Sequence, residues 1–200
     1  MYKRQITNST LSENTAVRGG GIYNDATANI TNSTLSGNNA TNVGGGIFNL
    51  ETAIITNSIV SGNTTDDFIA GQELRNQRYI TLSNSVIGSS ALSDAQAFGG
   101  IVAGGTVTIS ETIFAVSDVE NVPLNQIIGP LRDNGGPTKT HAFDFGSPAI
   151  DAAKGEDCPD TDQRGETRDN QCDIGAFEIV EEQSFFVVPL LNGKAVIFSL

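Results

Sequence analysis

A repeated segment of 24 or 25 residues constrains this chain more than any other feature. Its clearest copy reads ITNSTLSGN at residues 30–38 and closes with GGGIFN at residues 44–49. The matching copies place the same asparagine at Asn8, Asn32 and Asn57. A fixed period of this length is typical of a solenoid, in which each repeat is too small to bury a core alone and stacking supplies it.

The repeat unit has the chemistry of short β-strands. Apolar residues alternate with Thr and Ser, many are β-branched, and no helical periodicity is present. Asn and Gly separate these segments and tolerate the positive φ angles that tight turns need. We therefore predict an all-β fold, a right-handed parallel β-helix, with the hand taken from the crossover rule. A leucine-rich repeat is the competing solenoid, but its repeated leucine pattern is missing.

The stacked asparagines predict a structural ladder. Asn8, Asn32, Asn57 and Asn84 occupy the same place in successive repeats, and Glu111 takes that place in the fifth. Parallel strands would set them about 4.8 Å apart. We expect these side chains to point inward and to hydrogen-bond to the next asparagine and to backbone groups at the turn.

The domain boundaries follow from where the repeat starts, degrades and ends. Residues 1–5 resemble a translated sequencing adapter, and we set them apart from the fold; a short native arm is the alternative. We assign residues 6–122 to the coils and 123–182 to a capping region. Residues 183–200 predict a β-hairpin that turns at an Asn-Gly pair and docks on the last coils, with a sorting or anchoring tail as the alternative.

Charge and hydropathy exclude some partners. The formal net charge is −12, which argues against nucleic acid because phosphate binding needs clustered Lys and Arg. It also argues against an anionic membrane surface. No apolar run is long enough for a transmembrane helix.

The non-repetitive region resembles a known family. Its motifs are DNGGPTKTHA at residues 133–142, GSPAIDA at 146–152 and CDIGAFE at 172–178. Together with the GGGI and NSTLSGN repeats, they resemble bacterial surface or secreted β-helix proteins with polymorphic outer-membrane-protein-like repeats and a choice-of-anchor type C-terminal region. The resemblance implies an extracellular or cell-surface location. It implies no defined activity and offers no catalytic residues.

The two cysteines predict a disulfide. Cys158 and Cys172 are 14 residues apart in a turn-rich segment, and the implied extracellular setting favours oxidation. Closing such a loop would stabilise the fold by ~3 kcal/mol in the chain-entropy model. Free structural thiols are the alternative. A metal site does not follow, since two cysteines and one distant histidine do not complete a tetrahedral set.

An acidic cluster surrounds the first cysteine, formed by Glu156, Asp157, Asp160 and Asp162. Carboxylate oxygens at close spacing can bind calcium, yet the spacing does not match an EF-hand. We expect a solvated loop partly paired with the neighbouring Arg164 and Arg168. We therefore predict no cofactor and no metal ligand, with calcium as the alternative.

Candidate catalytic residues are few. Asp66 and Asp67 stand where the third coil lacks the triple glycine, but adjacent residues of a strand point to opposite faces. Asp25 and Glu51 could stack outward, although no basic residue is expected beside them. His141 is the only histidine, and no Ser or Cys nucleophile motif is near it in the sequence, so we predict a structural role.

These observations predict a non-enzymatic surface module, an adhesin-like scaffold that contacts carbohydrate or another protein through Thr, Ser and Asn ladders. A fragment of a carbohydrate-active enzyme, a polysaccharide lyase or glycoside hydrolase, is the alternative, because a β-helix does not determine function. A weaker reading is an ice-binding face, from the aligned Thr7, Thr31 and Thr56.

Overall fold

The chain is a parallel β-solenoid with a non-repetitive region packed along one side. The computed structural model describes residues 3–66, 71–88, 106–114, 122–144, 146–154, 158–180, 186–189 and 195–198. The predicted all-β parallel fold is confirmed, because every strand of the coils pairs in parallel with the strand one repeat away.

The first three turns each contain four strands. Turn one holds β1 (Lys3–Thr7), β2 (Thr10–Ser12), β3 (Thr15–Arg18) and β4 (Ile22–Asn24). Turn two holds β5 (Thr27–Thr31), β6 (Thr34–Ser36), β7 (Asn39–Val43) and β8 (Ile47–Asn49), and turn three β9 (Thr52–Thr56), β10 (Ile59–Val60), β11 (Thr64–Thr65) and β12 (Leu74–Asn76). The fourth turn contributes β13 (Tyr79–Ser83) and β14 (Val86–Ile87), and the fifth β15 (Thr106–Ser110) and β16 (Ile113–Phe114).

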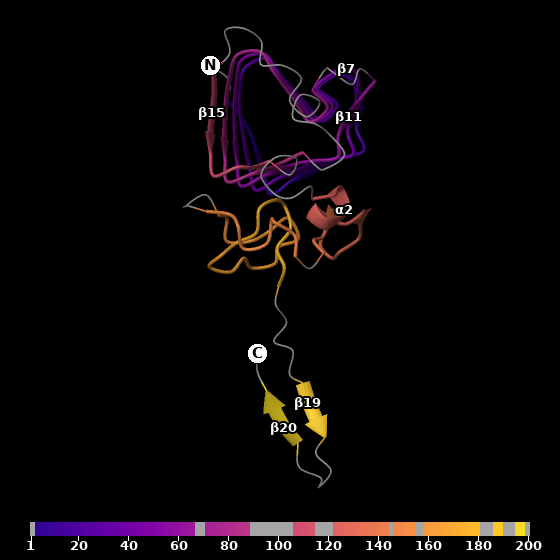
Figure 1. Cartoon of the computed structure of the whole chain (residues 1–200), viewed down its shortest axis with the longest axis vertical. Coiled ribbons are helices and arrows are strands. Elements are labelled where there is room, and N and C mark those ends of the chain that lie inside the picture. The colour runs from indigo at the N-terminus through magenta and orange to yellow at the C-terminus, as the bar shows by residue number, and fades with distance from the viewer. Residues whose placement is uncertain are drawn as a thin grey trace.

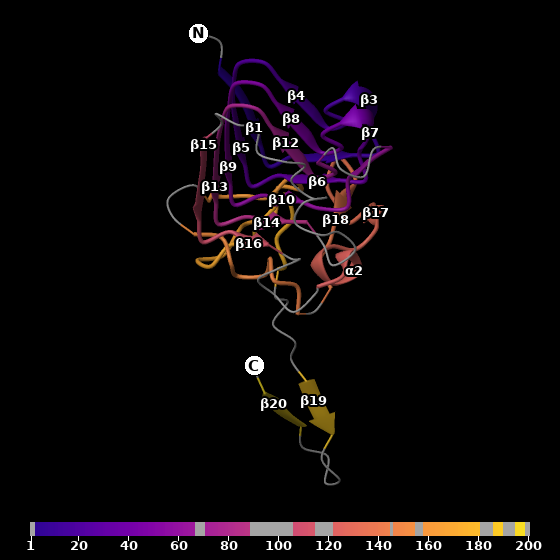
Figure 2. The same cartoon turned by 45° about the horizontal axis from the view of Figure 1, so that its top comes forward.

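The strands stack into four sheets that form the sides of the solenoid (Figures 1 and 2). The first sheet has the order β1-β5-β9-β13-β15 and the second β16-β14-β10-β6-β2. Two shorter sheets, β11-β7-β3 and β12-β8-β4, close the outline. Because β1 begins at Lys3, the first coil includes three of the residues that the sequence analysis set apart from it.

The interior is filled by the apolar residues of the alternating pattern. Ile30, Ile55 and Leu82 stack in the first sheet, and Leu35 and Val60 in the second, all with no exposed surface. Their neighbours along each strand point outward, as the two-residue period of a strand requires. This agrees with the prediction that stacking buries a core that no single repeat could build.

The predicted asparagine ladder exists as a column, but its role differs from the expectation. Asn8, Asn32, Asn57 and Asn84 all adopt φ between 45° and 48°, and Glu111 adopts 46°. They form the corner between the first and second sheets, where asparagine tolerates the left-handed conformation. No hydrogen bond joins the side chains of these four asparagines.

Two other asparagine columns form the hydrogen-bonded ladders. Asn24 donates to Asn49, and Asn49 to Asn76, each across 2.6 Å from Nδ2 to Oδ1. Asn14, Asn38 and Asn63 form the second ladder, with the corresponding distances both 2.9 Å. All but Asn14 are buried. These two columns have the same repeat period as the corner column, which is Asn8, Asn32, Asn57, Asn84 and Glu111. Spacing alone therefore does not tell the three columns apart.

The third turn lacks the triple glycine, and the residues that take its place are not the ones that the sequence analysis named. Register pairs Leu74 with Ile47, so Gly71, Gln72 and Glu73 take the places of the three glycines, rather than Asp66 and Asp67. Glu73 is fully buried. Its carboxylate accepts hydrogen bonds from the backbone N–H of Gly62 and from the backbone and side chain of Asn63. Asn14 and Asn38 each donate to the asparagine of the next coil. Glu73 accepts the corresponding bond from Asn63 and so ends the second ladder.

Residues 122–180, the C-terminal block, lie along the outer face of the second sheet rather than over the end of the stack (Figure 1). The block contains α2 (Leu124–Ile127), β17 (Leu131–Arg132) and β18 (Thr140–His141). Its apolar side chains meet Ile59 and Val86, which point away from the solenoid interior. Gly175 lies so close to the sheet that a Cβ there would be 2.9 Å from Thr34 Oγ1.

The predicted terminal hairpin is present. β19 (Phe186–Pro189) pairs antiparallel with β20 (Ala195–Phe198). The Asn-Gly turn lies outside the described residues. Figure 1 shows the hairpin apart from the coils, so the structure does not show the expected docking on the last coil.

Candidate functional site

The outer face of the first sheet carries a regular array of hydroxyl groups. Its three outward columns follow from the register of the five strands, because in the three middle strands the positions between these columns are buried. Most outward positions hold an aliphatic hydroxyl: Thr7, Thr27, Thr31, Thr52, Thr56, Thr81, Ser83, Thr106, Thr108 and Ser110. Thr27 and Thr56 are buried, and the other eight are at least partly exposed. The hydroxyl lattice predicted from three coils therefore extends over five.

One aromatic side chain stands out from this array. Tyr79 begins β13 and is 47% exposed, and the Arg78 guanidinium lies 5.4 Å from its ring centroid. Arg78 also forms an ion pair with Glu51 on the neighbouring coil, and Glu51 raises the pKa of Arg78. The ion pair holds a cation beside the exposed ring.

The paired charges on the coils correct one sequence-based expectation. Asp25 forms an ion pair with Arg4 at 3.0 Å, and Glu51 one with Arg78, so both acidic residues have basic partners. All four side chains are about half exposed. Asp66 is exposed at the end of β11, and Asp67 lies outside the described residues.

The corner column connects the coils to the C-terminal block. Asn57 accepts a hydrogen bond from the backbone N–H of Lys154 and donates one to its carbonyl oxygen, each at 3.1 Å. Asn8 donates to the Thr161 carbonyl at 2.6 Å. Glu111 completes the column with an ion pair to Lys154 at 2.7 Å. These residues therefore attach the block to the first, third and fifth coils.

The block itself is held by a buried ion pair and by the predicted disulfide. Cys158 is bonded to Cys172, as predicted. Arg168 donates to the Glu178 carboxylate at 2.7 Å, with both side chains almost fully buried. Burial raises the pKa of Glu178 despite this partner. The expectation that Arg168 would pair within the acidic loop is therefore wrong.

Of the two described members of the acidic cluster, Asp160 is exposed and Asp162 is buried. Asp162 accepts from Arg164 Nε at 2.8 Å and from the backbone N–H of Arg164, Glu166 and Glu178. This carboxylate has no exposed surface in its side chain. Glu156 and Asp157 lie outside the described residues. Across the part of the chain that is described, no three His, Cys, Asp or Glu side chains gather as a metal site.

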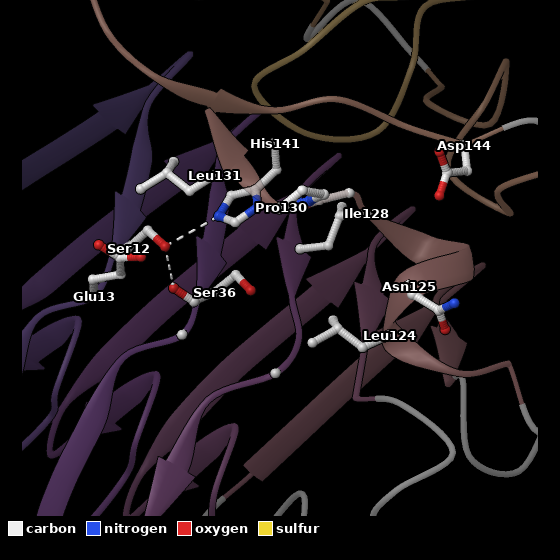
Figure 3. A pocket seen from close by; sticks show the side chains of 13 residues that line it. Ser12, Glu13, Ser36, Leu124, Asn125, Ile128, Pro130, Leu131, His141 and Asp144 are labelled. Atoms are coloured by element: carbon white, nitrogen blue, oxygen red, sulfur yellow. Dashed lines mark hydrogen bonds between the residues drawn. The ribbon is translucent and has the colours of Figure 1, made fainter. Parts of the chain in front are cut away.

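His141 occupies a setting that the sequence did not reveal. A cavity of about 600 Å³ lies between the coils and the C-terminal block (Figure 3). His141 lines it, and its Nε2 is 3.1 Å from Ser12 Oγ, although the two residues are 129 positions apart. The sequence has no Ser or Cys nucleophile motif beside His141, so it did not predict this neighbour in space. In the sequence, Ser12 is marked only by its place in the repeat, where Thr-Leu-Ser occurs at residues 10–12 and again at 34–36.

The fold defines the chain as a parallel β-solenoid with an attached disulfide-bonded block. Comparison with protein-family models, with curated proteins and with solved structures found no match. No helix in the described ranges has the length and apolar character to cross a membrane.

Proposed function

We propose that the coils form an adhesin-like scaffold at the bacterial cell surface or in the extracellular space, and that the first sheet binds extended carbohydrate without cleaving it. The observation that carries this proposal is the hydroxyl array around the exposed Tyr79. Thr and Ser hydroxyls both donate and accept, so they complement sugar hydroxyls. An exposed aromatic ring offers an apolar face for a sugar ring.

The location is supported by the disulfide, which persists in oxidising compartments. The resemblance to bacterial surface β-helix proteins with a choice-of-anchor type region points the same way. The alternative, a carbohydrate-active enzyme fragment, would need a paired acid and base on the coils. The exposed carboxylates Asp25 and Glu51 are instead each paired with an arginine.

The test is binding to a panel of insoluble neutral and acidic polysaccharides, followed by Tyr79→Ala. We expect this substitution to weaken binding about tenfold, the equivalent of 1.4 kcal/mol. Tyr23→Ala is the matched control, because Tyr23 is similarly exposed at 44% but belongs to β4 in another sheet.

Retention of no polysaccharide, or equal losses in the two variants, would contradict the proposal. The same incubations, with calcium added, report on the enzyme alternative through new chain ends. Inhibition of ice recrystallisation without polysaccharide binding would favour the ice-binding reading instead.

A further inference from the structure

The cavity between the coils and the C-terminal block has the size of a small-molecule site. Its volume of about 600 Å³ falls within the usual range for such pockets. Leu124, Ile128, Pro130 and Leu131 supply apolar lining from the block, and the coil side contributes the turn that follows β2. Figure 3 shows Ser12 and His141 facing each other there.

His141 is held in the orientation of a general base. Its Nδ1 lies 2.7 Å from the Gly129 carbonyl oxygen, which can only accept, so Nδ1 carries the proton. In the neutral imidazole, Nε2 then has a free lone pair. Burial lowers the pKa of His141, which favours this neutral form at pH 7. The lone pair faces Ser12 Oγ across 3.1 Å.

Ser12 has two acceptors within reach of its single proton. Its Oγ lies 2.6 Å from the Ser36 carbonyl oxygen and 3.1 Å from His141 Nε2. Ser61, in the same column, makes only the equivalent bond to the next coil, 2.7 Å to the Gly88 carbonyl. Rotation about the Cβ–Oγ bond can therefore turn the Ser12 proton from the Ser36 carbonyl oxygen to His141 Nε2. Ser61 has no corresponding second acceptor among the described residues.

Backbone strain next to Ser12 provides an independent observation. Glu13 adopts φ 60° where the following coils have Gly37 at 67° and Gly62 at 80°. A left-handed conformation costs a non-glycine residue about 1–2 kcal/mol, and such strain is concentrated at functional sites.

The geometry points to a serine ester hydrolase site, with Ser12 as the nucleophile, His141 as the general base and the Gly129 carbonyl as the group that orients the imidazole. This arrangement matches the nucleophile, base and orienting group of hydrolytic sites. The site lies on the second sheet and is separate from the proposed carbohydrate face, so it adds an activity to the scaffold.

The reaction balances as an ordinary two-step acyl transfer. Ser12 Oγ attacks the ester carbonyl carbon while His141 Nε2 takes the hydroxyl proton. The proton passes to the departing alcohol oxygen, leaving an acyl-serine. Water then attacks this ester with His141 as base, and the carboxylic acid and free Ser12 are released.

The lining indicates the class of substrate. The apolar side chains of the block suit a short, uncharged acyl group. The carboxyl groups of Glu13 and Asp144 also line the cavity, and they would repel an anionic ester. We therefore assign uncharged carboxylic esters with a small apolar acyl group.

The experiment combines a fluorophosphonate probe with p-nitrophenyl butyrate hydrolysis by the full chain. We expect the probe to add covalently to Ser12, located by peptide mass spectrometry. His141→Gln should lower hydrolysis by about 10²–10⁴-fold, the usual contribution of general acid–base catalysis, and Ser12→Ala should lower it by at least as much. The rate should fall as the pH drops below the pKa of His141.

Ser61→Ala is the matched control, since it removes the equivalent ladder bond without touching His141, and its rate should stay close to that of the wild type. Absence of probe on Ser12 in the folded wild-type chain would overturn the proposal, even if the variants failed to fold. Equal loss of activity in Ser12→Ala and Ser61→Ala would also overturn it, because a ladder bond would then explain both.

Discussion

Asparagine performs two distinct tasks in this chain. At the corner between the first two sheets, its backbone accepts the left-handed conformation, with φ of 45° for Asn32. In the buried ladders, its side chain supplies both a donor and an acceptor, so each amide satisfies the next one. Asn49 shows the second task most clearly, because its Nδ2 donates to Asn76 Oδ1 and to the Tyr79 carbonyl while its Oδ1 accepts from Asn24.

Asn49→Asp should therefore destabilise the solenoid by about 3 kcal/mol or more, because a carboxylate removes the donors and places a charge against buried oxygens. The measurement is the free energy of unfolding in urea. Asn39→Asp is the control: the Asn39 amide makes an exposed bond to Thr64 Oγ1, whose hydroxyl can rotate to donate instead. That variant should stay within about 0.5 kcal/mol of the wild type. Similar losses in both would contradict the ladder argument.

At the scale of elements, the molecule consists of a regular stack and an irregular block with little secondary structure of its own. The block is held to the second sheet by an apolar cluster and by bonds to the corner asparagines. Its internal order comes from buried polar contacts, such as that between Arg168 and Glu178, and from one disulfide. Because this block has few backbone hydrogen bonds between strands, its stability depends strongly on the disulfide and on the buried polar contacts.

Replacing both cysteines by serine should lower the free energy of unfolding by ~3 kcal/mol, the chain-entropy value for a loop of this size. Thermal unfolding of the wild type with and without a reductant gives the same comparison on one protein. We expect hydrogen exchange to accelerate first at the backbone N–H groups of Ile174 and Gly175, which bond to Ala149 and Asn57. An unchanged melting temperature would show that the block needs no covalent closure.

For the whole molecule, the strongest pH effect comes from the end of an internal ladder. Burial raises the pKa of Glu73 from 4.5 to about 7, against three hydrogen bonds that lower it. Between these values the folded state binds more protons than the unfolded state. Stability is therefore fully present below pH 4.5 and is lost as the pH rises through about 7. Asp173, with a pKa raised by burial to about 6, acts in the same direction.

We expect the free energy of unfolding to fall by about 3 kcal/mol between pH 4.5 and pH 7 because of Glu73 alone. Urea titrations at several pH values test this, and Glu73→Gln should flatten the slope because it cannot titrate there. The lowered pKa of His141 acts in the opposite direction below its ordinary 6.5. A slope that is the same in wild type and Glu73→Gln would rule out Glu73 as its source.

Much of the regular part was predictable because a repeat carries its own register. The period of Asn8, Asn32 and Asn57 placed equivalent residues side by side one coil apart, and the alternation around Ile30 and Ile55 separated core from surface. The pairing of Cys158 with Cys172 needed only a count of cysteines and the implied setting.

Only the tertiary structure decided how the block meets the coils, because no periodicity relates a non-repeating segment to the stack. It showed which asparagine columns bond to each other and placed Glu73 at the end of a ladder. It also brought Ser12 to His141 across 129 positions. Repeat spacing specifies neighbours within the stack, whereas contacts between the stack and the block arise from the packing of shapes that local sequence does not encode.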